Sequence, residues 1–267
     1  MFQTLRGIWL SNLEDNVFYL VQKDLTPFKY LTSLGLSNCN VALREGRTRG
    51  RTRTRKAFIE TLSSFEQLVK LDLSENSLAG CLGEVLESLA RPLEYLKLKR
   101  CDIVDADMES LARSKHAKSL KYLNVARVCG LFMLDDFAVT PACLVNCLKD
   151  FSALRVLHAQ QNQLGDAHAA DLCSTIERAW PHVKAINLAD NVLARNKCYD
   201  VVRSCALAPS VEYVKLPHAA QNMMGLHDHN SDKETFLKSL EAKAKANGKP
   251  QLKIEVLSVS FAFIGNP

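Results

Sequence analysis

The chain has 267 residues, 47% of them hydrophobic, and a formal net charge of +5. This composition excludes a disordered tail and supplies enough apolar side chains for a buried core. No apolar run approaches the roughly 18 residues that a membrane-spanning helix needs. Glu14 and Asp15 interrupt the start of the chain before a signal-peptide core can form. We therefore expect neither a transmembrane segment nor a cleaved leader.

A leucine-rich pattern, L-x-x-L-x-L-x-x-N/C-x-L, recurs along the whole chain. Most successive copies start 25–29 residues apart, and two longer spacings of 37 and 34 residues indicate insertions. The copies begin at Leu5, Leu31, Leu68, Leu93, Leu120, Leu154, Val183 and Val211.

Each copy predicts one short strand followed by a turn. Within L-x-L the aliphatic side chains point inward, and the residues between them face outward. The asparagine or cysteine that follows lies where the chain leaves the strand, and there it can bond to buried backbone groups of neighbouring turns. These structural turn positions are Cys39, Asn76, Cys101, Asn162 and Asn191.

Segments with helical spacing separate the predicted strands. Thr140 followed by Pro141 predicts a capped helix start, and residues 252–261 predict a last strand. Two apolar stripes are Leu82, Val85, Leu86 and Leu89, and then Leu172, Ile176 and Trp180.

A strand and a helix in each repeat predict an α/β fold, the leucine-rich-repeat solenoid. A curved parallel sheet is expected inside and the helices outside, in about eight irregular repeats. A single unit cannot bury its apolar face alone, so we expect residues 1–267 to form one domain.

A distinctive connector follows the strand expected after Leu93. The sequence from Pro92 reads PLEYLKLKRCDIVDADMESLARS. Its C-D-I-x-x-x-D-M-x-x-L-A-R-S pattern, and the irregular repeats after it, resemble the PRAME (preferentially expressed antigen in melanoma) family over about residues 31 to 265.

The resemblance implies a non-catalytic adaptor in the cytoplasm or the nucleus. Its protein partner would be a signalling kinase or a transcription regulator, and one branch of the family is associated with negative regulation of NF-κB signalling. Other members act as substrate receptors of cullin-RING ubiquitin ligases, and in several an upstream region contains an elongin-binding box. No leucine here has a cysteine four residues later, as that box requires. We therefore expect elongin and cullin to be recruited only through an N-terminal region that this chain lacks.

The outward strand positions are the best candidates for a protein-binding surface on the concave face. Stacking should place equivalent positions of neighbouring repeats about 5 Å apart. Tyr95 and Tyr122 would then be neighbours, a composition common in binding hot spots. The alternative is a set of solvated sheet residues, with tyrosine favoured by strand propensity. The candidates are Tyr95, Lys97, Lys99, Tyr122, Asn124, His158, Asn187, Tyr213 and Lys215.

Residues 44–56 carry seven arginines and lysines against Glu45, so this segment holds a charge of +6 and the rest of the chain −1. The run accounts for the 37-residue spacing, and we expect a disordered Arg-rich insertion there. An alternative function follows, a nucleic-acid-associated or nuclear regulatory protein that contacts phosphates through this segment. No aromatic residues are interleaved for base stacking, so we favour a protein partner.

Nine scattered cysteines without a CxxC pair predict buried free thiols in a reducing compartment, and no zinc site. The run His227-Asp228-His229, with Asp232 nearby, lacks a third spaced ligand pair, so we expect no metal and no cofactor. None of the motifs GxxxxGK, GxSxG, HExxH and GxGxxG occurs, so we expect no catalytic site.

Overall fold

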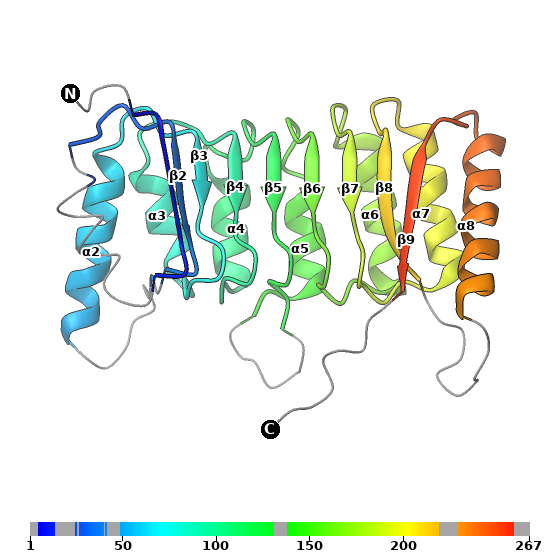
Figure 1. Cartoon of the computed structure of the whole chain (residues 1–267), viewed down its shortest axis with the longest axis horizontal. Helices are drawn as coiled ribbons and strands as arrows, with labels where there is room; N and C mark the ends of the chain where they lie inside the picture. The colour runs from blue at the N-terminus through cyan, green and yellow to red at the C-terminus, as the bar shows by residue number, and fades with distance from the viewer. Residues whose placement is uncertain are drawn as a thin grey trace.

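A computed structural model of the chain describes residues 5–13, 25, 27–39, 41, 49–130, 138–218 and 229–258, with only the backbone of 49–54, 229–231 and 258. The described residues form one parallel sheet whose nine strands lie side by side in chain order (Figure 1). The strands are β1 (Gly7–Ser11), β2 (Ser33–Ser37), β3 (Lys70–Asp72), β4 (Tyr95–Lys97), β5 (Tyr122–Asn124), β6 (Val156–His158), β7 (Ala185–Asn187), β8 (Tyr213–His218) and β9 (Lys253–Ser258).

A layer of helices covers one face of this sheet and leaves the other face open (Figure 1). The helices are α2 (Arg49–Ser63), α3 (Leu82–Ser88), α4 (Asp105–Arg113), α5 (Pro141–Leu148), α6 (Asp166–Arg178), α7 (Arg195–Leu207) and α8 (His229–Ala246). The predicted α/β leucine-rich-repeat solenoid is therefore confirmed. Within the described ranges, no helix combines the length and apolar character needed to span a membrane.

The strand register is the one that the repeat pattern predicts. Tyr95 pairs with Tyr122, which pairs in turn with Val156, and the same column continues to Tyr213 on β8. The last predicted strand is present as β9, which pairs with β8 from Lys253 onward. Side chains at equivalent repeat positions therefore stand in columns across the open face.

The core lies between the sheet and the helices. Leu96 and Leu98 of one repeat are fully buried, as the inward positions of L-x-L should be. The stripe on α6 continues into Trp180, whose indole Nε1 donates a hydrogen bond to the Leu148 carbonyl at 2.9 Å. The predicted start of α5 is also confirmed, because the Thr140 side chain accepts a bond from the Cys143 amide at 3.2 Å.

The buried asparagines join successive repeats through their backbones. The Asn162 side chain accepts bonds from the amides of Val128 and Cys129, at 2.9 and 3.0 Å, and donates one to the Val125 carbonyl at 2.8 Å. Asn76 and Asn191 make the equivalent bonds to the repeat before their own. Cys101 fills the same position, and its thiol bonds to the Leu73 carbonyl of the preceding repeat at 3.0 Å. These four side chains therefore bond to backbone groups of the repeat before their own.

The distinctive connector after β4 has a structural role. The buried carboxylate of Asp107 accepts bonds from the amides of Gly80, Leu82 and Val104, at 2.8, 3.1 and 3.0 Å. Two of these amides belong to the preceding repeat, at the start of α3. Met108 is fully buried beside it. The aspartate of the motif thus fixes one helix start against the next.

The expected disordered insertion at 44–56 is wrong for residues 49–56, which form the first half of α2. Residues 44–48 lie outside the described part of the chain. The helix is held by the fully buried Phe58 and Leu62, and Nε of Arg55 donates to the Glu84 carboxylate at 3.0 Å. Arginine is a good helix former, so a charged run can continue a helix that is anchored further along.

Candidate functional site

Four ring side chains, Trp9, Tyr95, Tyr122 and His158, form an aromatic stripe across the open face of the sheet. The rings of Tyr95 and Tyr122 are stacked, with centroids 4.2 Å apart and planes 15° apart. The ring centroids of His158 and Tyr122 lie 5.4 Å apart, and those of Trp9 and Tyr95, which meet edge to face, lie 6.5 Å apart. Stacked and edge-on pairs of this kind hold each other's rotamers, so the stripe is ordered before any partner arrives.

Trp9 reaches Tyr95 from β1, although β2 and β3 lie between their strands. The Trp9 side chain lies over Gly35 of β2, where an added Cβ would overlap the indole ring. The ring remains 53% exposed. Trp9 stands in the predicted outward column but is not among the candidates from the sequence. The signal that could have revealed it is a glycine directly beside a tryptophan in the same column.

Lys97 places a positive charge in the corner between two of these rings. Its Nζ lies 5.5 Å from the Tyr95 centroid, 5.9 Å from the Trp9 centroid and 3.2 Å from the Asp72 carboxylate. Burial lowers the pKa of Lys97, but the contacts with Tyr95 and Asp72 outweigh it and raise the pKa overall. The lysine is therefore charged at every physiological pH.

His158 and Tyr122 of the stripe are neutral near pH 7. Burial, together with the positive charges of Lys97 and Lys215, lowers the pKa of His158. Burial and the neighbouring Tyr95 raise the pKa of Tyr122 to about 12. The stripe thus presents uncharged rings beside a permanent cation, which is a surface suited to recognition.

Asn124 and Asn187 lie in the same outward column as Lys97. The side-chain oxygen of Asn124 accepts a bond from the Ala126 amide, and that of Asn187 accepts one from the Ala189 amide, both at 3.0 Å. Each asparagine therefore uses its acceptor locally, and the amide group of the buried Asn124 lies against the Tyr122 hydroxyl.

The remaining candidates lie apart from the stripe. The Tyr213 hydroxyl donates to Glu255 at 2.7 Å, and Lys215 pairs with the same carboxylate at 3.4 Å. Lys99 pairs with Glu75 at 3.1 Å. The structure thus brings Tyr95, Tyr122 and Lys97 together as predicted, whereas Tyr213 and Lys215 belong to a second cluster at β8 and β9.

The comparisons with known proteins agree with this architecture. The family profile of the PRAME C-terminal domain matches residues 8–212. The chain belongs to the PRAME family. Leucine-rich repeat-containing protein 14 of Xenopus laevis is 27% identical over 202 residues, which are 72% of this chain and 36% of that protein. The PRAME-family chain thus spans little more than a third of the length of this relative.

Two further proteins are similar to this PRAME-family chain. Ribonuclease inhibitor of Sus scrofa is 30% identical over 193 residues, which are 62% of this chain and 42% of the inhibitor. The leucine-rich repeat-containing protein LegL7 of Legionella pneumophila has a similar structure, with a TM-score of 0.55 and 15% sequence identity. That match covers 95% of this chain and 83% of the other, and it shows the shared fold.

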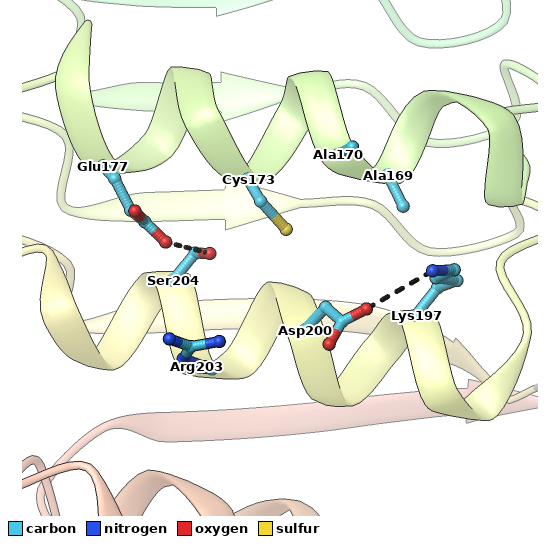
Figure 2. Close-up of a pocket in the computed structure, with 8 residues that line it drawn as sticks. All are labelled: Ala169, Ala170, Cys173, Glu177, Lys197, Asp200, Arg203 and Ser204. Atoms are coloured by element: carbon cyan, nitrogen blue, oxygen red, sulfur yellow. Dashed lines mark hydrogen bonds and ion pairs between the residues drawn. The ribbon is translucent and has the colours of Figure 1, made fainter.

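A pocket of about 190 Å³ lies on the helical face of the PRAME-family chain, between α6 and α7 (Figure 2). The thiol of Cys173 points into it. The Ser204 hydroxyl donates to Glu177 at 2.6 Å, and Lys197 pairs with Asp200 at 3.5 Å. Burial raises the pKa of Cys173, so the thiol stays protonated near pH 7 and is a poor nucleophile. The lining residues are Ala169, Ala170, Cys173, Glu177, Lys197, Asp200, Arg203 and Ser204.

The other cysteines fit the expected buried thiols. All nine are free, and all except Cys143 and Cys173 are buried. The sulfurs of Cys143 and Cys147 lie 3.9 Å apart on α5, and burial raises the pKa of both thiols. No group of three metal-binding side chains occurs among the residues that the structure describes. His227 and Asp228 lie outside that part.

Proposed function

We propose that this PRAME-family chain is a non-catalytic adaptor that holds a protein partner on the open, concave face of its sheet. The observation that carries the proposal is the aromatic stripe, with Trp9 53% exposed and Tyr95 stacked on Tyr122. Tryptophan and tyrosine dominate protein-binding hot spots. Rings that are already ordered lose little conformational entropy when a partner covers them.

The similarity to a protein named ribonuclease inhibitor supports the same class of function. That name describes a protein whose ligand, a ribonuclease, is another protein. The leucine-rich-repeat fold and the family membership are those of interaction scaffolds. The fold itself supports no particular partner, because one fold can carry many sites.

The finer part of the proposal comes from the family resemblance. We propose that the partner is a signalling kinase or a transcription regulator in the cytoplasm or the nucleus, and that binding restrains NF-κB signalling. A role as the substrate receptor of a cullin-RING ubiquitin ligase is the second form of this proposal. Because we expect elongin and cullin to bind only through an upstream region, their co-purification with a form of the protein that includes such a region would favour the ligase role. A kinase or transcription regulator captured without them favours the signalling role.

The nucleic-acid alternative receives less support. It depends on the Arg-rich segment, and Arg55 of that segment is buried against the helix layer, where it binds Glu84. At least this arginine holds α2 to α3. Steep weakening of binding with added salt would favour phosphate contacts over the stripe.

The test of the proposal removes the two stacked rings. A partner is captured from cell lysate, identified and purified, and its affinity is measured by isothermal titration calorimetry. We expect the Tyr95→Ala/Tyr122→Ala double variant to lose about 2 kcal/mol of binding free energy or more, a factor of about 30. The control is Tyr30→Ala, which removes a tyrosine that is 49% exposed and stands outside the stripe. Unchanged affinity in a folded double variant would refute the proposed function.

A further inference from the structure

We infer that five outward residues, the donor row, bind an acidic, extended segment of the partner protein. The row takes one residue from each of the strands β4–β8. This inference rests on the proposed function and adds the chemistry of the partner. The donor row consists of Lys97, Asn124, His158, Asn187 and Lys215.

The register makes the row continuous. Lys97 pairs with Asn124, which pairs with His158, and the same column runs on through Asn187 to Lys215. Neighbouring parallel strands are about 4.8 Å apart, so the four steps from Lys97 to Lys215 cover about 19 Å. An extended peptide rises about 3.3 Å per residue, and about six residues span the row.

The polar groups of the row are mostly donors. The oxygens of Asn124 and Asn187 already accept backbone amides, and this fixes the orientation of both side-chain amides. Their NH2 groups are therefore turned away from the backbone, and that of Asn124 lies against the Tyr122 hydroxyl. Lysine can only donate, and a neutral imidazole has one donor. A ligand that satisfies such a row must be rich in acceptors.

The charge of the surrounding surface also favours an acidic ligand. The outward positions of β4–β8 in this column and the column beside it hold no acid. The nearby carboxylates Glu94 and Glu212 are paired with Lys121 and Lys184, at 2.7 and 2.8 Å. Around the row, the outward lysines are Lys70, Lys97, Lys99, Lys215 and Lys253, against the acids Asp72, Glu75 and Glu255.

Two of these acids stand at the ends of the row and help to place it. Asp72 holds Lys97 at one end, at 3.2 Å, and Glu255 holds Lys215 at the other, at 3.4 Å. Both ammonium groups are thereby fixed on the sheet face before a partner binds. The aromatic stripe runs along the same strands through Tyr95, Tyr122 and His158. Apolar side chains that alternate with the carboxylates of the segment can lie on these rings.

The experiment uses a fluorescein-labelled octaglutamate as the probe and octaglutamine as its uncharged control, with fluorescence anisotropy as the readout. We expect the full chain to bind octaglutamate and not octaglutamine. The Lys97→Gln/Lys215→Gln variant should weaken this binding at least tenfold. The matched control, Lys238→Gln/Lys245→Gln, removes the same charge from exposed positions of α8 and should change it less than twofold.

A second pair of variants tests the orientation of the donors. Asn187→Asp keeps an acceptor for the Ala189 amide and replaces the outward NH2 with an oxygen, so we expect at least a fivefold loss of octaglutamate affinity. Asn196→Asp is the control, because its side-chain oxygen also accepts a backbone amide, from Lys197 at 2.9 Å, at an exposed site on α7. Equal effects of the two substitutions would overturn the inference.

Absent octaglutamate binding, or equal losses in the two lysine double variants, would also overturn it. So would tighter, equally row-dependent binding of a labelled eight-residue oligothymidylate, which would assign the row to phosphate. Failure of the proposed function looks different. In that case octaglutamate binds through the row, but Tyr95→Ala/Tyr122→Ala leaves partner affinity unchanged. If only the inference fails, the tyrosine variant weakens the partner while octaglutamate does not bind.

Discussion

Replacing Asn162 with leucine tests the link between the repeat pattern and the stability of the solenoid. The two side chains have the same number of heavy atoms, so the change alters polarity more than size. Asn162 is fully buried and bonds to the amides of Val128 and Cys129 and to the Val125 carbonyl. Asn162→Leu leaves these three backbone groups without a partner inside the protein.

An unsatisfied buried polar group costs about 1–3 kcal/mol, so three of them cost about 3–9 kcal/mol before relaxation. Burial of the leucine side chain returns about 2 kcal/mol. We therefore expect a loss of about 1–7 kcal/mol in the free energy of unfolding. Urea denaturation followed by circular dichroism measures it, with the m-value as a check that the folded state is the same.

The matched control is Asn187→Leu, because Asn187 bonds only to the Ala189 amide among the contacts described and faces outward. We expect it to cost about 1 kcal/mol or less. A loss below about 1 kcal/mol for Asn162→Leu, at an unchanged m-value, would refute the role assigned to the turn asparagines.

Two further predictions concern buried polar groups. Burial lowers the pKa of His116, whose Nδ1 accepts from the Leu93 amide at 2.9 Å and whose Nε2 lies 2.9 Å from the Leu86 carbonyl. Its unfolded pKa of 6.5 is higher than its folded pKa, so protonation favours unfolding, and stability should fall as the pH drops below about 6.5. Urea midpoints between pH 8 and pH 5 should show a shallower slope in His116→Gln, and equal slopes would contradict this. Asp107→Ala should cost about 2 kcal/mol or more because three amides lose their acceptor, whereas Asp102→Ala, at an exposed position of the same motif, should stay within about 0.5 kcal/mol. Similar melting temperatures for the two variants would count against the capping role of Asp107.

The fold could be predicted from the sequence because the residue pattern of each repeat determines the local structure of that repeat. Alternation within L-x-L fixes which side chains face the core, and the asparagine three residues further on fixes where the chain turns. Stacking then follows, so that Tyr95 opposite Tyr122 could be read from spacing alone. The turn positions Asn76, Asn162 and Asn191 were predictable for the same reason, since their bonds are set by the repeat.

Contacts that cross several repeats could not be predicted in this way. Trp9 on β1 can approach Tyr95 on β4 only because Gly35, on the intervening strand β2, has no side chain. The hydrogen bond from Tyr213 to Glu255 depends on where β9 places the Glu255 carboxylate. Neither is encoded in a single repeat, because both depend on how side chains of different repeats meet.

The Arg-rich segment shows a different limit of the sequence. Its composition favours solvation, but Phe58 and Leu62, which follow the segment on α2, are fully buried and anchor the helix. Burial of these apolar residues stabilises the helix, and a charged side chain of the segment is paired with an acid of α3, in the ion pair of Arg55 with Glu84. A charge run next to an apolar stripe therefore gives weak evidence for a loop.

Site-specific photo-crosslinking tests most directly the claim that the concave face holds the partner. A photoreactive phenylalanine analogue is placed at Val156, in the outward column between Tyr122 and Ala185, or at the exposed Lys238 on α8. After irradiation with the purified partner, we expect a crosslink from position 156 and none from position 238. A crosslink from position 238 alone, with position 156 silent in a folded protein, would contradict the assignment of the binding face.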